Sequence, residues 1–302
     1  MFLPLFFKHP LSKNRPFNAV FRYVWWHLSK PFRQQPMIYQ VVDGVKIYIG
    51  KNDSAGLVNY YTGLYEFEEM SFVLHFLRPD DLLIDVGSNI GIFSLLGAGA
   101  SGCKTLSFEP LPGTFQKFRK NVELNGLYDK VNSLNMGVAA AKGVLRFTNQ
   151  DENSLNKVAN DGDIDFVEVG VVRLDDMLTN IESAECLLMK IDVEGYETEV
   201  INGAEELLRD PRLKAIIIEL NGSGLHFGFD ESLIKEKIES NGFDLFYYNP
   251  FKRELTKEAP SYEWGNALYV RDLETIKKRV EDTKPIKELT FTLWTACCKS
   301  SP

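Results

Sequence analysis

The chain has 302 residues, of which 44% are hydrophobic and 25% charged, so it can bury a sizeable core. Its formal net charge is −8. Because phosphate contacts need clustered Lys and Arg, this acidic balance argues against a nucleic acid as substrate or partner. A neutral glycan or a small-molecule acceptor stays open.

The first 35 residues have the opposite charge, with six Lys or Arg and no Asp or Glu. The remaining residues carry 28 basic and 42 acidic side chains, a balance of −14. Residues 17–33 predict a short helix before the breaker Pro31, with aromatic and basic side chains interleaved. This helix can lie on an anionic membrane surface as a peripheral contact, or it can pack on the main domain.

No stretch reaches the roughly 18 uninterrupted apolar residues of a membrane span. The four cysteines follow no zinc or disulfide spacing, which favours a reducing compartment. We therefore expect a cytoplasmic protein, with peripheral attachment at the inner face of the membrane as an open alternative. The oligomeric state does not follow from the sequence.

Further along, residues 38–50 predict a β-hairpin turning at Asp43-Gly44, and residues 64–77 predict a helix. Strand and helix patterns then alternate, with extended segments at 143–149 and 166–172 joined by the polar segment 150–163. Seven strands are predicted, at 82–86, 105–108, 131–136, 187–191, 215–220, 243–248 and 267–270. Helices are predicted to open near Asn89 and to cover 114–125, 197–209 and 231–240.

This alternation predicts an α/β fold, with a doubly wound, mostly parallel seven-stranded sheet. The last two strands have no helix between them, so they must pair antiparallel or lie apart. That ending is characteristic of the Rossmann-like sheet of class I methyltransferases. We expect an N-terminal helical and hairpin extension over 1–60, the sheet domain over 61–272 and a C-terminal tail over 273–302.

A glycine-containing loop, DVGSNIG, follows the strand at 82–86. Gly87 and Gly91 let the backbone turn and approach a ligand, and Ser88 lies between them. The carboxylate of Asp85 suits the α-amino group of S-adenosylmethionine and suits a pyrophosphate poorly. A helix opening at Asn89 would offer N–H groups to the carboxylate of this cofactor.

Glu109 closes the next strand in TLSFEP, followed by Pro110, and can accept both ribose hydroxyls. Nicotinamide oxidoreductases place an acid similarly, but their loop reads G-x-G-x-x-G, and this one does not. The adenine is expected near residues 135–138. The cofactor contacts predicted here are Asp85, Gly87, Ser88, Asn89, Gly91, Glu109 and Pro110.

The strand at 187–191 leads into the run KIDVEGYE. Asp192 could be a general base, orient the acceptor, bind the cofactor or cap the next helix, as Glu194 could. Lys190 is unusual in an apolar strand and predicts an ion pair, with Glu219 as one partner, or a role in activating the acceptor.

His226 lies on a loop after the fifth strand and is a second candidate general base; simple solvation is the alternative. Asp192, Glu219 and Asn221 offer oxygen ligands for a divalent cation, although no metal motif supports one. The Asn/Asp-Pro-Pro-aromatic run typical of methyltransferases acting on planar nitrogen does not follow the fourth strand. This favours oxygen as the acceptor atom.

The chain resembles the FkbM-type methyltransferases in LIDVGSNIGIFSLL, in LSFEPLPGTFQKFRKNVELN and above all in LLMKIDVEGYETEVINGAEELL followed by IIIEL. The resemblance covers about 80–220 and implies O-methylation of a sugar, glycan or natural-product hydroxyl. It also implies cofactor contacts at Asp85, Gly87, Asn89, Gly91 and Glu109 and site roles for Asp192 and Glu194. GLYEFEE resembles the segment before the sheet, so Glu66 could reach the amino acid end of the cofactor. The alternative function is a non-catalytic S-adenosylmethionine-binding or scaffold subunit of a glycan-biosynthesis complex.

Overall fold

The computed structural model describes residues 3–148, 157–159, 165–181, 183–259 and 265–283. Its N-terminal part is helical around a hairpin, as predicted, and the hairpin turns at Asp43-Gly44. The elements of this part are α1 (Leu3–Lys8), α2 (Pro16–Ser29), η1 (Lys30–Phe32), β1 (Met37–Val42), β2 (Val45–Ile49) and α3 (Ser54–Thr62). None of the helices that the structure describes is long and apolar enough to cross a bilayer.

The central sheet has eight strands in the order β12-β11-β13-β10-β9-β3-β4-β5. Seven of them are the predicted strands: β3 (Leu82–Val86), β4 (Lys104–Phe108), β5 (Val131–Leu134), β9 (Leu187–Ile191), β10 (Leu213–Glu219), β11 (Asp244–Asn249) and β13 (Asn266–Val270). The predicted number of seven was wrong by one, because the short edge strand β12 (Glu254–Thr256) pairs with β11. It has too few residues to show an alternating pattern.

The last strand, β13, lies antiparallel between β10 and β11, whereas β10, β9, β3, β4 and β5 are parallel. Of the two alternatives for the last two strands, antiparallel pairing or separate positions, the structure shows antiparallel pairing. The class I methyltransferase topology then follows from the order of the strands.

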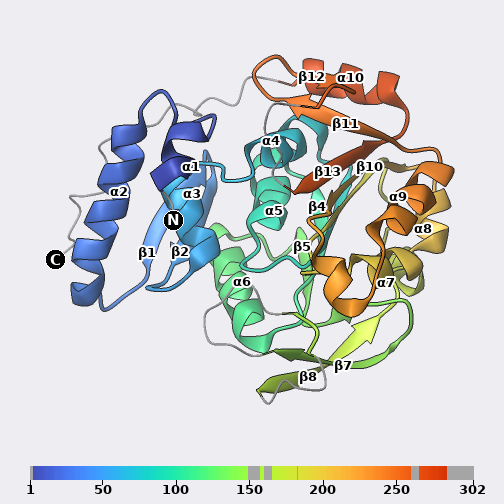
Figure 1. Cartoon of the computed structure of the whole chain (residues 1–302), viewed down its shortest axis with the longest axis horizontal. Helices are drawn as coiled ribbons and strands as arrows, with labels where there is room; N and C mark the ends of the chain where they lie inside the picture. The colour runs from blue at the N-terminus through green and yellow to red at the C-terminus, as the bar shows by residue number, and fades with distance from the viewer. Residues whose placement is uncertain (1–2, 149–156, 160–164, 182, 260–264, 284–302) are drawn as a thin grey trace.

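Helices cover both faces of this sheet (Figure 1). One face packs on α7 (Glu197–Asn202), α8 (Glu205–Arg209) and α9 (Glu231–Ser240). The other face and its apolar core include α4 (Phe67–Phe76), α5 (Ile92–Leu95), the π-helix η2 (Leu96–Ser101) and α6 (Pro112–Asn125). The helix predicted over 197–209 is two short helices, because Gly203 lies between them and packs against the carbonyl oxygen of Ala139.

A smaller sheet, β6-β8-β7, is built from β6 (Gly137–Val138), β7 (Gly143–Thr148) and β8 (Phe166–Val172). It lies at the lower edge of the view in Figure 1 and confirms the two extended segments. Most of the predicted polar joining segment 150–163 lies outside the described residues. The 3-10 helix η3 (Asp175–Ile181) follows β8.

The chain described after β13 ends in α10 (Leu273–Glu281), whose Ile276 and Val280 are fully buried in the core. Arg279 also pairs with the buried Asp81, with 2.5 Å between nitrogen and oxygen. The first part of the predicted tail 273–302 therefore packs on the sheet domain, and residues 284–302 lie outside the described residues.

Candidate active site

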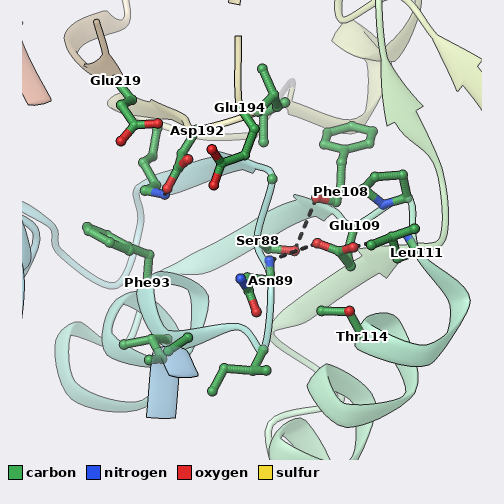
Figure 2. A pocket seen from close by; sticks show the side chains of 18 of the residues that line it. Ser88, Asn89, Phe93, Phe108, Glu109, Leu111, Thr114, Asp192, Glu194 and Glu219 are labelled. Atoms are coloured by element: carbon green, nitrogen blue, oxygen red, sulfur yellow. Dashed lines mark hydrogen bonds and ion pairs between the residues drawn. The ribbon is translucent and has the colours of Figure 1, made fainter. Parts of the chain in front are cut away.

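A cavity of about 390 Å³ opens at the carboxyl ends of β3, β4, β9 and β10. Parallel α/β sheets hold their ligands at this edge, because the loops that follow the strands converge there. Residues of α3 and of the segment before α4 close the other side. Figure 2 shows the side chains that point into this space.

The loop after β3 forms the floor of the cavity through Gly87, Ser88 and Asn89. Gly87 has φ +80°, and a Cβ there would stand 1.8 Å from the carbonyl oxygen of Asp192. Only glycine therefore fits between the ends of β3 and β9. The prediction that a helix opens at Asn89 was wrong: Asn89 has φ +50° and α5 begins at Ile92.

Glu109 lies beside this loop, as predicted, with its carboxylate held by two backbone amides. Its Oε2 accepts from the N–H of Asn89 at 2.9 Å, and its Oε1 accepts from the N–H of Leu111 at 2.9 Å (Figure 2). Burial raises the pKa of Glu109 to about 7, against the lowering effect of these two amides. The N–H predicted for a ligand carboxylate is therefore already taken by Glu109.

Asp85 and Gly91, two of the predicted cofactor contacts, are not among the described residues that line the cavity. Asp85 is fully buried, and its Oδ2 accepts from the hydroxyl of Ser94 at 2.5 Å and from the backbone N–H of Ser94 at 3.1 Å. Gly91 faces Phe118, whose ring lies where a Cβ would be. Both residues therefore contribute to the shape of the loop and do not line the cavity. The predicted contacts that do line the cavity are Glu66, Gly87, Ser88, Asn89, Glu109, Pro110 and Asp192.

Lys190 is 3% exposed and lines the cavity. Its Nζ donates to Oδ2 of Asp192 at 2.8 Å, so the predicted ion pair exists but the partner Glu219 was wrong. Asp192 lies two residues further along the chain and so on the same side of the sheet. The Nζ also lies 4.7 Å from the ring centroid of Phe93. Burial lowers the pKa of Lys190, but Asp192, Glu66 and Asp85 together raise it above its ordinary value.

Asp192, Glu194 and Glu219 form a group of acids in which carboxylate oxygens of the three residues lie within 4.8 Å of one another. Figure 2 shows them facing the cavity above Ser88 and Asn89. Burial and the neighbouring charge of Asp192 raise the pKa of Glu194 to about 7 and that of Glu219 to about 8. This spacing would accommodate one divalent cation. The predicted ligand set was Asp192, Glu219 and Asn221, and in the structure Glu194 takes the place of Asn221. The Oδ1 of Asn221 instead accepts from the backbone N–H of Ser223.

His226 is exposed on η4 (Ser223–Phe227), where its ring packs edge-on against Phe227. The described residues that line the cavity do not include it. Gly222 and Gly228, both at positive φ, flank this short helix. The structure therefore does not place His226 with the other candidate residues.

Two walls of the cavity lie outside the motifs from which the cofactor contacts were predicted. The wall from the N-terminal part is formed by Ser54, Val58 and Asn59 of α3, with Tyr65 beyond it. At the opposite end the cavity is lined by Met136, Gly137, Val138 and Phe147, where the adenine was expected. Only the resemblance around Glu66 gave a signal for the first of these walls.

A sequence model of the methyltransferase FkbM domain matches residues 85–245, which is more than half of the chain. The chain belongs to the FkbM methyltransferase family. The match includes the loop after β3, Glu109 and the run from Lys190 to Glu194. In this FkbM methyltransferase, the segment that matches the family model therefore supplies most of the cavity. The wall formed by α3 lies outside that segment.

Curated relatives agree with this assignment. "Methyltransferase 1" of Beauveria bassiana is 29% identical over 194 residues, which are 57% of this chain and 76% of that protein. The hexuronic acid methyltransferase AglP of Haloferax volcanii is 27% identical over 158 residues, 52% of this chain and 62% of that protein. The 31-O-demethyl-FK506 methyltransferase FkbM of Streptomyces tacrolimicus is 28% identical over 177 residues, 48% of this chain and 67% of that protein.

Among solved structures, a methyltransferase FkbM from Methylobacillus flagellatus aligns with a TM-score of 0.44 and 15% identity. The alignment covers 72% of this chain and 52% of that chain.

Proposed function

We propose that this FkbM methyltransferase transfers the methyl group of S-adenosylmethionine to a hydroxyl oxygen of a sugar, glycan or natural-product acceptor. One observation carries the proposal. The same cavity contains the Gly87 turn, the amide-bound Glu109 and the acids Asp192, Glu194 and Glu219. The cavity would thereby combine the cofactor with a group that can take a proton.

The charges of the cavity suit this cofactor, which carries a cationic amino group and a cationic sulfur. Lys190 is the only Lys or Arg among the described lining residues, against five acids: Glu66, Glu109, Asp192, Glu194 and Glu219. Burial raises the pKa of four of these acids, and a cationic ligand would favour their ionised form, whereas a pyrophosphate would oppose it. Glu66 is held by Asn266, whose side-chain amide donates to Oε1 at 2.6 Å, and it would face the amino acid end.

When bound, S-adenosylmethionine supplies a methyl group activated by a positively charged sulfur. The protein has to align the acceptor oxygen with this methyl group and remove the hydroxyl proton. Asp192, fixed by Lys190, is suited to orient the hydroxyl. Glu219 is suited to take the proton, since no described residue donates to its Oε2 and its pKa of about 8 lies near neutral pH.

The acceptor class rests on the polar character of the wall and on the names of the relatives. Ser54 and Tyr65 bring hydroxyl groups to the cavity, which a hydroxylated acceptor can use. One relative is named for a hexuronic acid, and the name of another specifies an oxygen of FK506. The first name supports a sugar acid as the acceptor class, and the second supports oxygen as the acceptor atom.

The experiment is a transfer assay with S-adenosylmethionine carrying a labelled methyl group, against uronic acids, neutral sugars and planar amines. Label is expected in ether linkage on a sugar acid or sugar. Asp192→Asn should lower the rate about a hundredfold or more, as expected for loss of the group that orients the acceptor hydroxyl. His226→Ala is the matched control and should leave the rate unchanged. Labelling of the amines alone, or a rate lost in His226→Ala and kept in Asp192→Asn, would overturn the proposal.

A further inference from the structure

The outer surface of α2 and η1 is apolar, which is the reverse of an ordinary surface helix. Five large side chains recur every three or four residues and so share one side of the helix. They and their exposed fractions are Phe17 (79%), Phe21 (63%), Trp25 (44%), Leu28 (67%) and Phe32 (85%). We call these five residues the aromatic row. Figure 1 shows α2 at the outer edge of the molecule, away from the central sheet.

The other side of α2 is already used for packing. Ala19 and Trp26 are buried, and Arg22 donates to the backbone carbonyl oxygen of Tyr60 in α3 at 2.8 Å. The helix therefore cannot rotate to bury the aromatic row without losing these contacts. Contiguous exposed apolar side chains of this kind mark an interaction surface in soluble proteins.

The segment of the chain that carries the aromatic row has charges of one sign. The chain carries no Asp or Glu before Asp43. Lys8, Lys13 and Arg15, which precede α2 directly, are exposed. A surface of aromatic side chains flanked by cations complements the boundary between anionic headgroups and acyl chains, where aromatic residues enter the interface and cations meet phosphates.

We propose that the aromatic row docks this protein on an anionic lipid bilayer, with α2 lying parallel to the membrane plane. A second copy of the chain fits the surface less well. Two rows packed together would bring the exposed Lys13 and Arg15 of both copies close to each other, with no acid in the segment to offset their repulsion.

The helix α3 lies between this docking surface and the cavity proposed for methyl transfer. The residues Ala55, Val58 and Asn59 of α3 line the cavity, while Tyr60 packs against Trp26 of α2 at 6.3 Å between ring centroids. Only one helix therefore separates the membrane-facing surface from the cavity. The lipid contact itself does not depend on the cofactor or on the acceptor of the proposed function.

The test is co-sedimentation of the full chain with vesicles of phosphatidylcholine alone or mixed with phosphatidylglycerol. Leu28→Glu is compared with Leu233→Glu, a leucine on α9 that is similarly exposed at 59%. The wild type and Leu233→Glu should bind the mixed vesicles, and Leu28→Glu should bind about tenfold less. The double variant Lys13→Glu, Arg15→Glu should also bind about tenfold less, and added salt should weaken binding by the wild type.

Three results would overturn the proposal. The first is wild-type protein that stays in solution with the mixed vesicles, and the second is equal binding by Leu28→Glu and the wild type. The third is a dimer of the wild type in sedimentation velocity without lipid, provided that Leu28→Glu is a monomer and that the wild type does not bind vesicles. That outcome would assign the aromatic row to a second copy. Thermal unfolding of each variant shows whether the fold is retained.

Discussion

Lys190 donates a hydrogen bond of 2.8 Å to Asp192, two residues further along the same chain, at the end of the central strand β9. On the neighbouring strand β3, Asp85 stands directly opposite Lys190 in the register. Lys190 also faces Ile217 on β10, which places Glu219 two residues further on the same side of the sheet. The strand register and the alternation of side chains therefore place Asp85, Asp192 and Glu219 on the same side of the sheet as the buried ammonium group.

Removal of this ammonium group should destabilise the protein. Lys190→Met leaves Asp85 and Asp192 without their cation, and breaking such a pair costs about 3 kcal/mol of the free energy of unfolding. The matched control is Lys214→Met, whose partner Asp272 lies on the surface at 2.8 Å and contributes less than about 1 kcal/mol. Urea unfolding of both variants measures the difference, and equal losses would contradict the role of Lys190.

The close approach of β3 and β9 predicts that Gly87→Ala is severely destabilising. A Cβ would collide with the backbone of Asp192, and φ +80° is unfavourable for alanine, at a cost of about 3 kcal/mol or more. Gly113→Ala is the control, because nothing lies within 4 Å of a Cβ at that position in α6. It should be neutral or slightly stabilising. Melting temperatures check both, and a normal melting temperature for Gly87→Ala would refute the packing described.

Glu109→Gln tests the carboxylate that is held by two amides. A glutamine side chain can accept through only one atom, so either Asn89 or Leu111 loses its partner. Loss of one such bond should lower the affinity for S-adenosylhomocysteine about tenfold. Glu123→Gln, at an exposed position of α6, should bind as the wild type does. Calorimetric titration measures both, and an unchanged affinity in Glu109→Gln would remove Glu109 from the cofactor site.

The acids of the cavity also predict how stability depends on pH. Burial raises the pKa of Glu194 from 4.5 to about 7 and that of Glu219 from 4.5 to about 8. The folded protein therefore keeps protons that the unfolded chain has already released. Their contribution to stability is complete below pH 4.5 and is lost as the pH rises through 7 and then 8.

Urea unfolding of the ligand-free protein at several pH values measures this loss. Glu219→Gln cannot ionise, so it should be less sensitive to pH across that interval and more stable than the wild type at its upper end. A wild type whose stability rises over the same interval would contradict the burial of these carboxylates.

The parallel sheet and its cofactor edge were predictable because apolar strands, breakers and the DVGSNIG loop are local signals. The contacts of single side chains were less predictable. Asp85 ends a strand just as a ligand-binding acid would, but its orientation toward Ser94 depends on the path of the loop. The partner of Lys190 depends on three strands in register. The α3 wall comes from residues distant in sequence, so no short motif could reveal it.

The claim that the cavity binds S-adenosylmethionine is tested most directly by calorimetric titration of the wild-type protein with S-adenosylhomocysteine and, separately, with NAD. The account predicts saturable binding of S-adenosylhomocysteine at micromolar concentration and no heat with NAD. It also predicts that Gly113→Ala binds equally well, because Gly113 is not among the described residues that line the cavity and a Cβ there meets no neighbour. Absence of heat with S-adenosylhomocysteine, from protein shown to be folded by its melting curve, would contradict it.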